Sequence, residues 1–239
     1  MVFIHGYNVT FEDAARRTAQ MAFDLKFDGA AVMYSWPARG DLLDYLRDGT
    51  AARQTEPNAV QFLLAVAREA GVQQLHLVAH SMGNRVLTET LKRIADEGPP
   101  GALTNVNQVV LTAPDIDANV FRRDIVPRIA GAAQRITIYT SADDNALKAS
   151  RRLHGFPRLG EGGATAFPDY PNIDVVDATG IDTSLLGHSY YGECQPVLGD
   201  LRLVLGGIPA NQRGLALRPD RGLWRMVEQT ASRPAPPRR

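Results

Sequence analysis

Short runs of almost uniformly apolar residues recur along the chain and alternate with segments of helical periodicity. The runs around Leu77 and Val110 show hardly any alternation between polar and apolar residues. A strand that is apolar on both faces must be covered on both, which is typical of a parallel sheet between two helix layers. The sequence therefore predicts an α/β fold with a doubly wound parallel sheet of about six strands. The predicted strands are Val2–His5, Ala30–Trp36, Gln74–Ala79, Asn107–Ala113, Arg135–Ser141 and Ile173–Asp177.

Helices are predicted in the intervals between these runs. The clearest spans about residues 83–97, where apolar residues recur at helical spacing until Gly98-Pro99-Pro100 ends the pattern. Others are expected near residues 11–25, 59–70, 118–130, 145–153 and 196–205. We expect one α/β domain over residues 1–205. An Arg- and Pro-rich extension should follow over residues 206–239, packed in part through Trp224 and frayed at its end.

Composition excludes several classes of function. The 239 residues include 26 Lys or Arg and 26 Asp or Glu, whereas nucleic-acid binders usually carry a basic excess. Cys194 is the one cysteine, which excludes an intrachain disulfide and a cysteine-based metal site within one chain. No apolar run approaches the ~20 residues that span a bilayer. We expect no signal peptide in this chain, because the first strand-like run begins at Val2. We expect no nucleic-acid partner, no transmembrane segment and, by default, a cytoplasmic protein.

The most informative stretch is Ala79-His80-Ser81-Met82-Gly83, which joins a predicted strand directly to a predicted helix. It has the small-x-Ser-x-small pattern of a nucleophile elbow, with alanine in place of the usual first glycine. Small residues are needed because the serine sits on a sharp, strained turn and the helix passes close to the strand end. The helix start also offers unpaired N–H groups to an anion. The alternative is an ordinary turn in which Ser81 caps the helix.

Together with the elbow, several other stretches resemble serine α/β-hydrolases, and more narrowly the bacterial DUF900 group, which contains esterases. They are Phe3–Asn8, Tyr34–Pro37, Leu111–Asp117, Ser141–Leu147 and Gly187–Tyr190. The resemblance covers about residues 2–205 and implies an α/β-hydrolase-type sheet. Val2–His5 corresponds to the third strand of that fold, so the usual first two strands look absent. Either Ala30–Trp36 then forms an open edge, which can pair with a second copy in a homodimer, or a longer natural N-terminus was lost.

A reactive serine needs a histidine base and an acid, which follow the serine in the order acid, then histidine, in these hydrolases. Only His154 and His188 come after Ser81. His188 is the predicted base because it lies in the loop after the last predicted strand. Open α/β folds bind ligands at the carboxyl ends of their strands. The acid is Asp144 or its neighbour Asp143, and the resemblance favours Asp144. The alternatives are a structural hydrogen bond for His188 and a helix cap for Asp144.

The remaining parts of a catalytic site are predicted from the position of the elbow for Met82 and from the resemblance for Tyr7. The backbone N–H groups of Met82 and Tyr7 would form the oxyanion hole. Asn8 follows Tyr7 directly, and Trp36 and Tyr190 lie near predicted strand ends, so we expect these three residues to contact the substrate. The alternative for the two aromatic residues is plain packing. We interpret His5 as a structural residue, and Asp115 and Asp117 as pocket-rim or structural residues.

These residues predict a serine carboxylic-ester hydrolase that works through an acyl-enzyme on small or short-chain esters. The chemistry needs no cofactor and no metal. Two alternatives stay open at this point. The same triad can hydrolyse thioesters or amides, and a non-catalytic binding module can share the fold.

Overall fold

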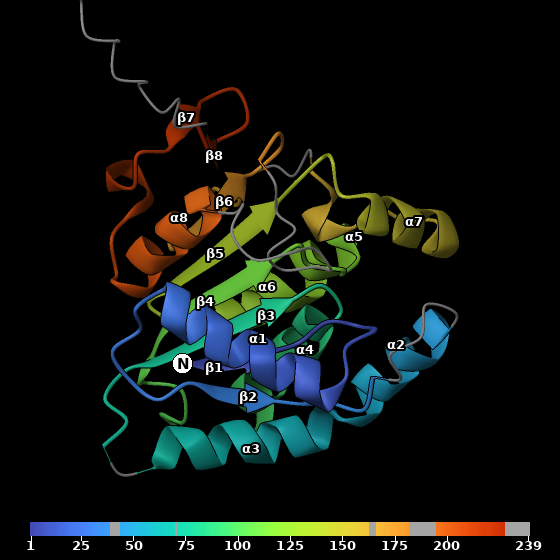
Figure 1. The fold of residues 1–239 in the computed structure, drawn as a ribbon, viewed down its shortest axis with the longest axis vertical. Helices are drawn as coiled ribbons and strands as arrows, with labels where there is room; N and C mark the ends of the chain where they lie inside the picture. The colour runs from blue at the N-terminus through green and yellow to red at the C-terminus, as the bar shows by residue number, and fades with distance from the viewer. Residues whose placement is uncertain (39–43, 70, 163–165, 182–194, 228–239) are drawn as a thin grey trace, which may run out of the picture.

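The computed structural model describes residues 1–38, 44–69, 71–162, 166–181 and 195–227. Their strands form one sheet in the order β2-β1-β3-β4-β5-β6-β8-β7 (Figure 1). The strands are β1 Val2–Ile4, β2 Val32–Tyr34, β3 Leu75–His80, β4 Val106–Thr112, β5 Arg135–Thr140, β6 Ile173–Asp177, β7 Ala216–Arg218 and β8 Leu223–Arg225. The α-helices are α1 Phe11–Asp24, α2 Tyr45–Gln54, α3 Glu56–Arg68, α4 Gly83–Glu97, α5 Ala118–Val120, α6 Val126–Ile129, α7 Asn145–His154 and α8 Gln195–Leu205. Shorter π and 3-10 turns span Phe121–Ile125, Ala130–Ala132, Leu159–Glu161 and Ala210–Gln212.

The α/β class predicted from the apolar runs is confirmed, but the predicted count of six strands is wrong. The described residues form an 8-stranded sheet. The two additional strands come from the C-terminal extension: β8 pairs in parallel with β6, and β7 pairs antiparallel with β8. Each has three residues, and two of the three β7 residues are exposed. Such strands lack the continuous apolar run that identified the others.

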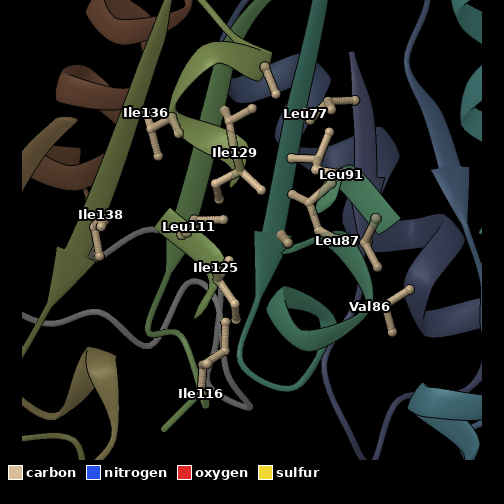
Figure 2. Close-up of a cluster of buried hydrophobic side chains, with 14 of the residues drawn as sticks. Leu77, Val86, Leu87, Leu91, Leu111, Ile116, Ile125, Ile129, Ile136 and Ile138 are labelled. Carbon is tan, nitrogen blue, oxygen red and sulfur yellow. The ribbon is translucent and has the colours of Figure 1, made fainter. Parts of the chain in front are cut away.

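The central strands are covered on both faces, as their composition predicts. Leu77, Val109 and Ile138 point into a core with α3, α4 and α6. Their sequence neighbours Val78 and Val110 point into a second core with α1 and α8, because successive side chains of a strand face opposite sides. Figure 2 shows the first core, where strand side chains such as Leu111 lie among the leucines and isoleucines of the covering helices.

Parallel pairing brings the loops that carry the candidate residues to one edge of the sheet. Strands β2, β1, β3, β4, β5 and β6 are consecutive neighbours and run in parallel. Their carboxyl ends therefore meet at the same edge, which is where open α/β folds bind ligands. Strand β2 is at one end of the sheet, as predicted for Ala30–Trp36, and a dimer through it stays a prediction. None of the helices in the described ranges is long and apolar enough to cross a membrane.

Candidate active site

Ser81 forms a strained turn between β3 and α4. Its φ of +50° lies in the left-handed region, which costs a residue other than glycine about 1–2 kcal/mol. Backbone hydrogen bonds on both sides hold it there. The Ser81 N–H donates to the Thr112 carbonyl oxygen at 3.0 Å, and the Ser81 carbonyl oxygen accepts from the Asp115 N–H at 3.2 Å. The sharp, strained turn predicted for Ser81 is confirmed.

The residues two positions before and after Ser81, Ala79 and Gly83, are both small and buried. A Cβ atom on Gly83 would clash with the carbonyl oxygens of His5 and Ile4, the second at 2.6 Å. Helix α4 therefore starts directly against the end of β1. Ala79 is fully buried at the end of β3. A larger residue at position 83 would push the helix away from the strand, and a larger one at position 79 would have to displace its buried neighbours.

The loop after β1 runs beside the serine. A Cβ atom on Gly6 would lie 3.0 Å from the Ser81 Cβ, so this loop passes in contact with the elbow. Tyr7 is half-buried, and its ring meets the Tyr45 ring edge-on at 5.2 Å. The Asn8 N–H is directed toward the Asp48 carboxylate at 3.5 Å, and Asn8 has a φ of +56°. The structure thus brings both expected oxyanion segments, the start of α4 and the Tyr7 loop, next to Ser81.

His5 and Trp36 are structural partners of each other. The Nε2 atom of His5 accepts from the Trp36 N–H at 3.2 Å, and the Trp36 indole donates to the His5 carbonyl oxygen at 2.8 Å. The two rings stack at 5.3 Å, and burial lowers the pKa of His5. The structural role interpreted for His5 fits these contacts. Trp36 is 2% exposed, which fits the packing alternative for this residue, and a substrate contact through Trp36 stays a prediction.

The two candidate acids make different contacts at the end of β5. An Asp144 oxygen accepts from the Leu147 N–H at 2.9 Å, so this carboxylate caps α7. Burial raises the pKa of Asp144, against the effect of the Leu147 N–H. Asp143 is exposed and accepts from the Gly180 N–H, in the loop after β6, at 2.8 Å. The helix cap left open for Asp144 is present, and both carboxylates lie at the same sheet edge as Ser81.

The predicted base and one predicted substrate contact, His188 and Tyr190, lie outside the described residues. The other histidine that follows the serine, His154, is half-buried at the end of α7. Its Nδ1 atom lies 3.0 Å from the Ser150 carbonyl oxygen, and its ring meets the Tyr45 ring edge-on. These contacts fit a structural histidine.

A buried ionic cluster around Asp115 adjoins the elbow, since the Asp115 N–H donates to the Ser81 carbonyl oxygen. Its carboxylate is held by Arg158 at 2.7 Å, Arg85 at 2.9 Å, the Ser150 hydroxyl at 2.6 Å and the Tyr45 hydroxyl. Burial alone would raise the pKa of Asp115, but the two guanidinium groups hold it below its ordinary value. Burial and Asp115 together raise the pKa of Tyr45 to about 12. Asp115 therefore joins α2, α4, α7 and the loop before Leu159.

The sequence interpretation left Asp115 between a pocket-rim and a structural residue, and these contacts give it a structural role. Asp117 caps α5 by accepting from the Asn119 and Val120 N–H groups. The partners of Asp115 were missed because they come from four separate segments, which no local pattern connects. Within the described residues, no group of three or more His, Cys, Asp or Glu side chains is placed to hold a metal ion.

Comparison with known proteins agrees with this architecture. The family described as "Alpha/beta hydrolase of unknown function (DUF900)" matches residues 1–205. An uncharacterized protein of Nostoc sp. (strain PCC 7120) is 24% identical over an aligned region that covers 61% of this chain. That region is 52% of the Nostoc protein, so the chain spans about half the length of this relative.

Proposed function

We propose that this chain, which belongs to the family of α/β hydrolases of unknown function, is a serine carboxylic-ester hydrolase with Ser81 as its nucleophile. The observation that carries the proposal is the left-handed φ of +50° at Ser81, between a buried strand and a helix start. A strained serine at this junction has a clear chemical use, because in a nucleophile elbow such a turn raises the hydroxyl above the sheet edge and beside the N–H groups of the helix start. An ordinary helix cap needs no such strain.

In the proposed reaction, the Ser81 Oγ attacks the ester carbonyl carbon while His188 takes the hydroxyl proton. The carbonyl electron pair moves onto oxygen, where the N–H groups of Met82 and Tyr7 stabilise it. The intermediate then expels the alcohol, which receives the proton from His188, and leaves an acyl group on Ser81. A water molecule deprotonated by His188 attacks this acyl group and releases the carboxylic acid, with the proton returning to Ser81.

The burial of the two aspartates favours Asp144 as the acid. Asp144 is half-buried and Asp143 is exposed, and an acid that orients a histidine works best when it is shielded from water. We therefore assign this role to Asp144. Asn8 and Tyr190 are assigned to the substrate site, and the substrates to small or short-chain carboxylic esters.

Labelling with a fluorophosphonate probe tests the assignment of Ser81. The wild-type protein should be labelled and should hydrolyse a short-chain p-nitrophenyl ester, whereas Ser81→Ala should do neither. His188→Ala should lower turnover by roughly 10³-fold or more while the fold is kept. Both variants are checked by circular dichroism.

Two results would contradict the proposal. Folded wild-type protein that is neither labelled nor active would favour the non-catalytic binding module. Activity that persists in Ser81→Ala would place the nucleophile elsewhere. A panel of matched esters, thioesters and amides then ranks the three substrate classes.

A further inference from the structure

The side chain of Asn84 comes from the first turn of α4 and contacts the elbow from the buried side. It is fully buried. Its Nδ2 atom donates to the Ser81 carbonyl oxygen at 2.9 Å and to the Thr112 carbonyl oxygen at 3.0 Å. Both partners are acceptors, so the nitrogen of the amide must face them. Asn84 therefore ties the elbow to the last residue of β4.

The Ser81 carbonyl oxygen accepts three hydrogen bonds. Besides the Asn84 side chain, the backbone N–H groups of Asn84 and Asp115 donate to it, each at 3.2 Å. This carbonyl and the Met82 N–H belong to one planar peptide unit, and the described residues contain no cis peptide bond. In a trans peptide unit the oxygen and the N–H point in opposite directions. Holding the oxygen therefore also sets the direction of the Met82 N–H.

Packing alone gives no reason for an amide at this position. The Oδ1 atom of Asn84 is buried and has no hydrogen-bond partner among the described residues. A buried acceptor without a partner is unfavourable, and an apolar side chain would avoid this cost. This unfavourable buried oxygen belongs to the residue whose amide nitrogen holds the strained turn at Ser81. Such backbone strain persists only where surrounding contacts impose it.

We infer that Asn84 is a positioning residue, which fixes the Ser81–Met82 peptide so that the Met82 N–H points toward the developing oxyanion. This inference rests on the proposed hydrolase function. It gives the Asn84 side chain a role in transition-state stabilisation, through Met82, and none in substrate binding. Loss of its hydrogen bonds should thus lower kcat much more than it changes KM.

Asn105 provides a matched control. Its Nδ2 atom also donates to two carbonyl oxygens, of Ala67 at 3.0 Å and of Val72 at 3.3 Å. It precedes β4, at the opposite edge of the sheet from Ser81. Asn105→Ala thus removes a comparable pair of hydrogen bonds far from the elbow.

The experiment compares the wild type, Asn84→Ala and Asn105→Ala as full chains. It measures kcat and KM for a short-chain p-nitrophenyl ester, the inhibition constant of a trifluoromethyl ketone, and the thermal midpoint. We expect Asn84→Ala to lower kcat by about 10- to 100-fold and to weaken the ketone, whose adduct carries an oxyanion, by a similar factor. KM should stay within about two-fold, and Asn105→Ala should lower the midpoint while both kcat and inhibition stay within about two-fold.

The inference is overturned if Asn84→Ala keeps kcat and ketone inhibition near wild type, or if Asn105→Ala lowers kcat as much. Should Asn84→Ala not fold, Asn84→Ser, which keeps one donor, is measured in the same way and must show the same split between kcat and KM. Fluorophosphonate labelling of Ser81 in the wild type separates the two claims. Without that labelling the proposed function fails, whereas with it only the role of Asn84 is in question.

Discussion

Asp143 and Asp144 are adjacent residues that hold two different backbone groups. Asp144 caps α7 through the Leu147 N–H, and Asp143 holds the Gly180 N–H. Both contacts need only an oxygen acceptor, which an asparagine side chain also supplies. Replacement by asparagine therefore keeps these hydrogen bonds and removes the charge, so that stability and catalysis can be measured separately.

We expect Asp144→Asn to lower kcat by roughly 10³- to 10⁴-fold, because a neutral amide cannot stabilise the protonated histidine base. Asp143→Asn should change kcat by less than about ten-fold. Both variants should keep thermal midpoints close to wild type, since asparagine caps α7 about as well as aspartate and also accepts from the Gly180 N–H. Steady-state kinetics and thermal melts check this. The reverse order of the two activities would transfer the role of the acid to Asp143.

At the scale of elements, the decisive contact is the one between the start of α4 and the end of β1. Gly83 has no side chain, so the helix approaches the carbonyl groups of Ile4 and His5 directly. This approach sets where Met82 and Ser81 lie relative to the loop that carries Tyr7. A shift of this helix would therefore change the elbow and the oxyanion hole together.

Gly83→Ala should lower the free energy of unfolding by about 3 kcal/mol, because its Cβ meets a backbone that cannot move aside cheaply. The control is Gly131→Ala, whose Cβ would meet nothing within 4 Å. That variant should be neutral or stabilising by up to about 1 kcal/mol. Urea denaturation measures both values. Equal effects of the two substitutions would contradict the close approach of α4 to β1.

At the scale of the whole molecule, the C-terminal extension is part of the sheet. The family match ends at residue 205. After that residue, β8 pairs with β6, and the Arg213 side chain packs into the domain. Its side chain is fully buried and lies 3.3 Å from Asp200 of α8 and 3.7 Å from Asp174 of β6. The Tyr139 hydroxyl also donates to Asp200 at 2.6 Å. The extension is thus attached by a buried ion cluster as well as by strand pairing.

Arg213→Met should lower the free energy of unfolding by roughly 3–5 kcal/mol at neutral pH, because Asp200 then stays buried without its cation. Burial already raises the pKa of Asp200, against the effect of Arg213, so removing the guanidinium raises it further. A folded-state pKa above the unfolded one costs stability as pH rises. The deficit should therefore be larger at pH 7 than at pH 4.

Denaturation of Arg213→Met at the two pH values checks this prediction. Arg218→Met is the control in the same extension, because Arg218 pairs with Asp220 at an exposed position. It should change stability by no more than about 1 kcal/mol. A second variant, Arg213→Met with Asp200→Asn, should recover part of the loss. A deficit that is independent of pH would show that Asp200 does not carry the effect.

The fold class and the elbow could be predicted because they depend on local patterns. Uniformly apolar runs such as the one around Val110 require cover on both faces, and the order strand, small residue, serine, small residue, helix specifies one kind of turn. The short strands β7 and β8 could not be predicted, because they have no continuous apolar run. They are recognised as strands by their pairing with neighbours in the sheet.

The sequence by itself determined which segments become buried strands and which serine ends one of them, since burial and turn geometry follow from neighbouring residues. Only the tertiary structure decided that Trp36 packs on His5, that Asp115 gathers two arginines, and that the Asn84 amide holds the Ser81 carbonyl. These contacts join segments that are far apart in the chain or depend on the direction of one side chain. That direction is set by packing and hydrogen bonding in three dimensions, which no local pattern encodes.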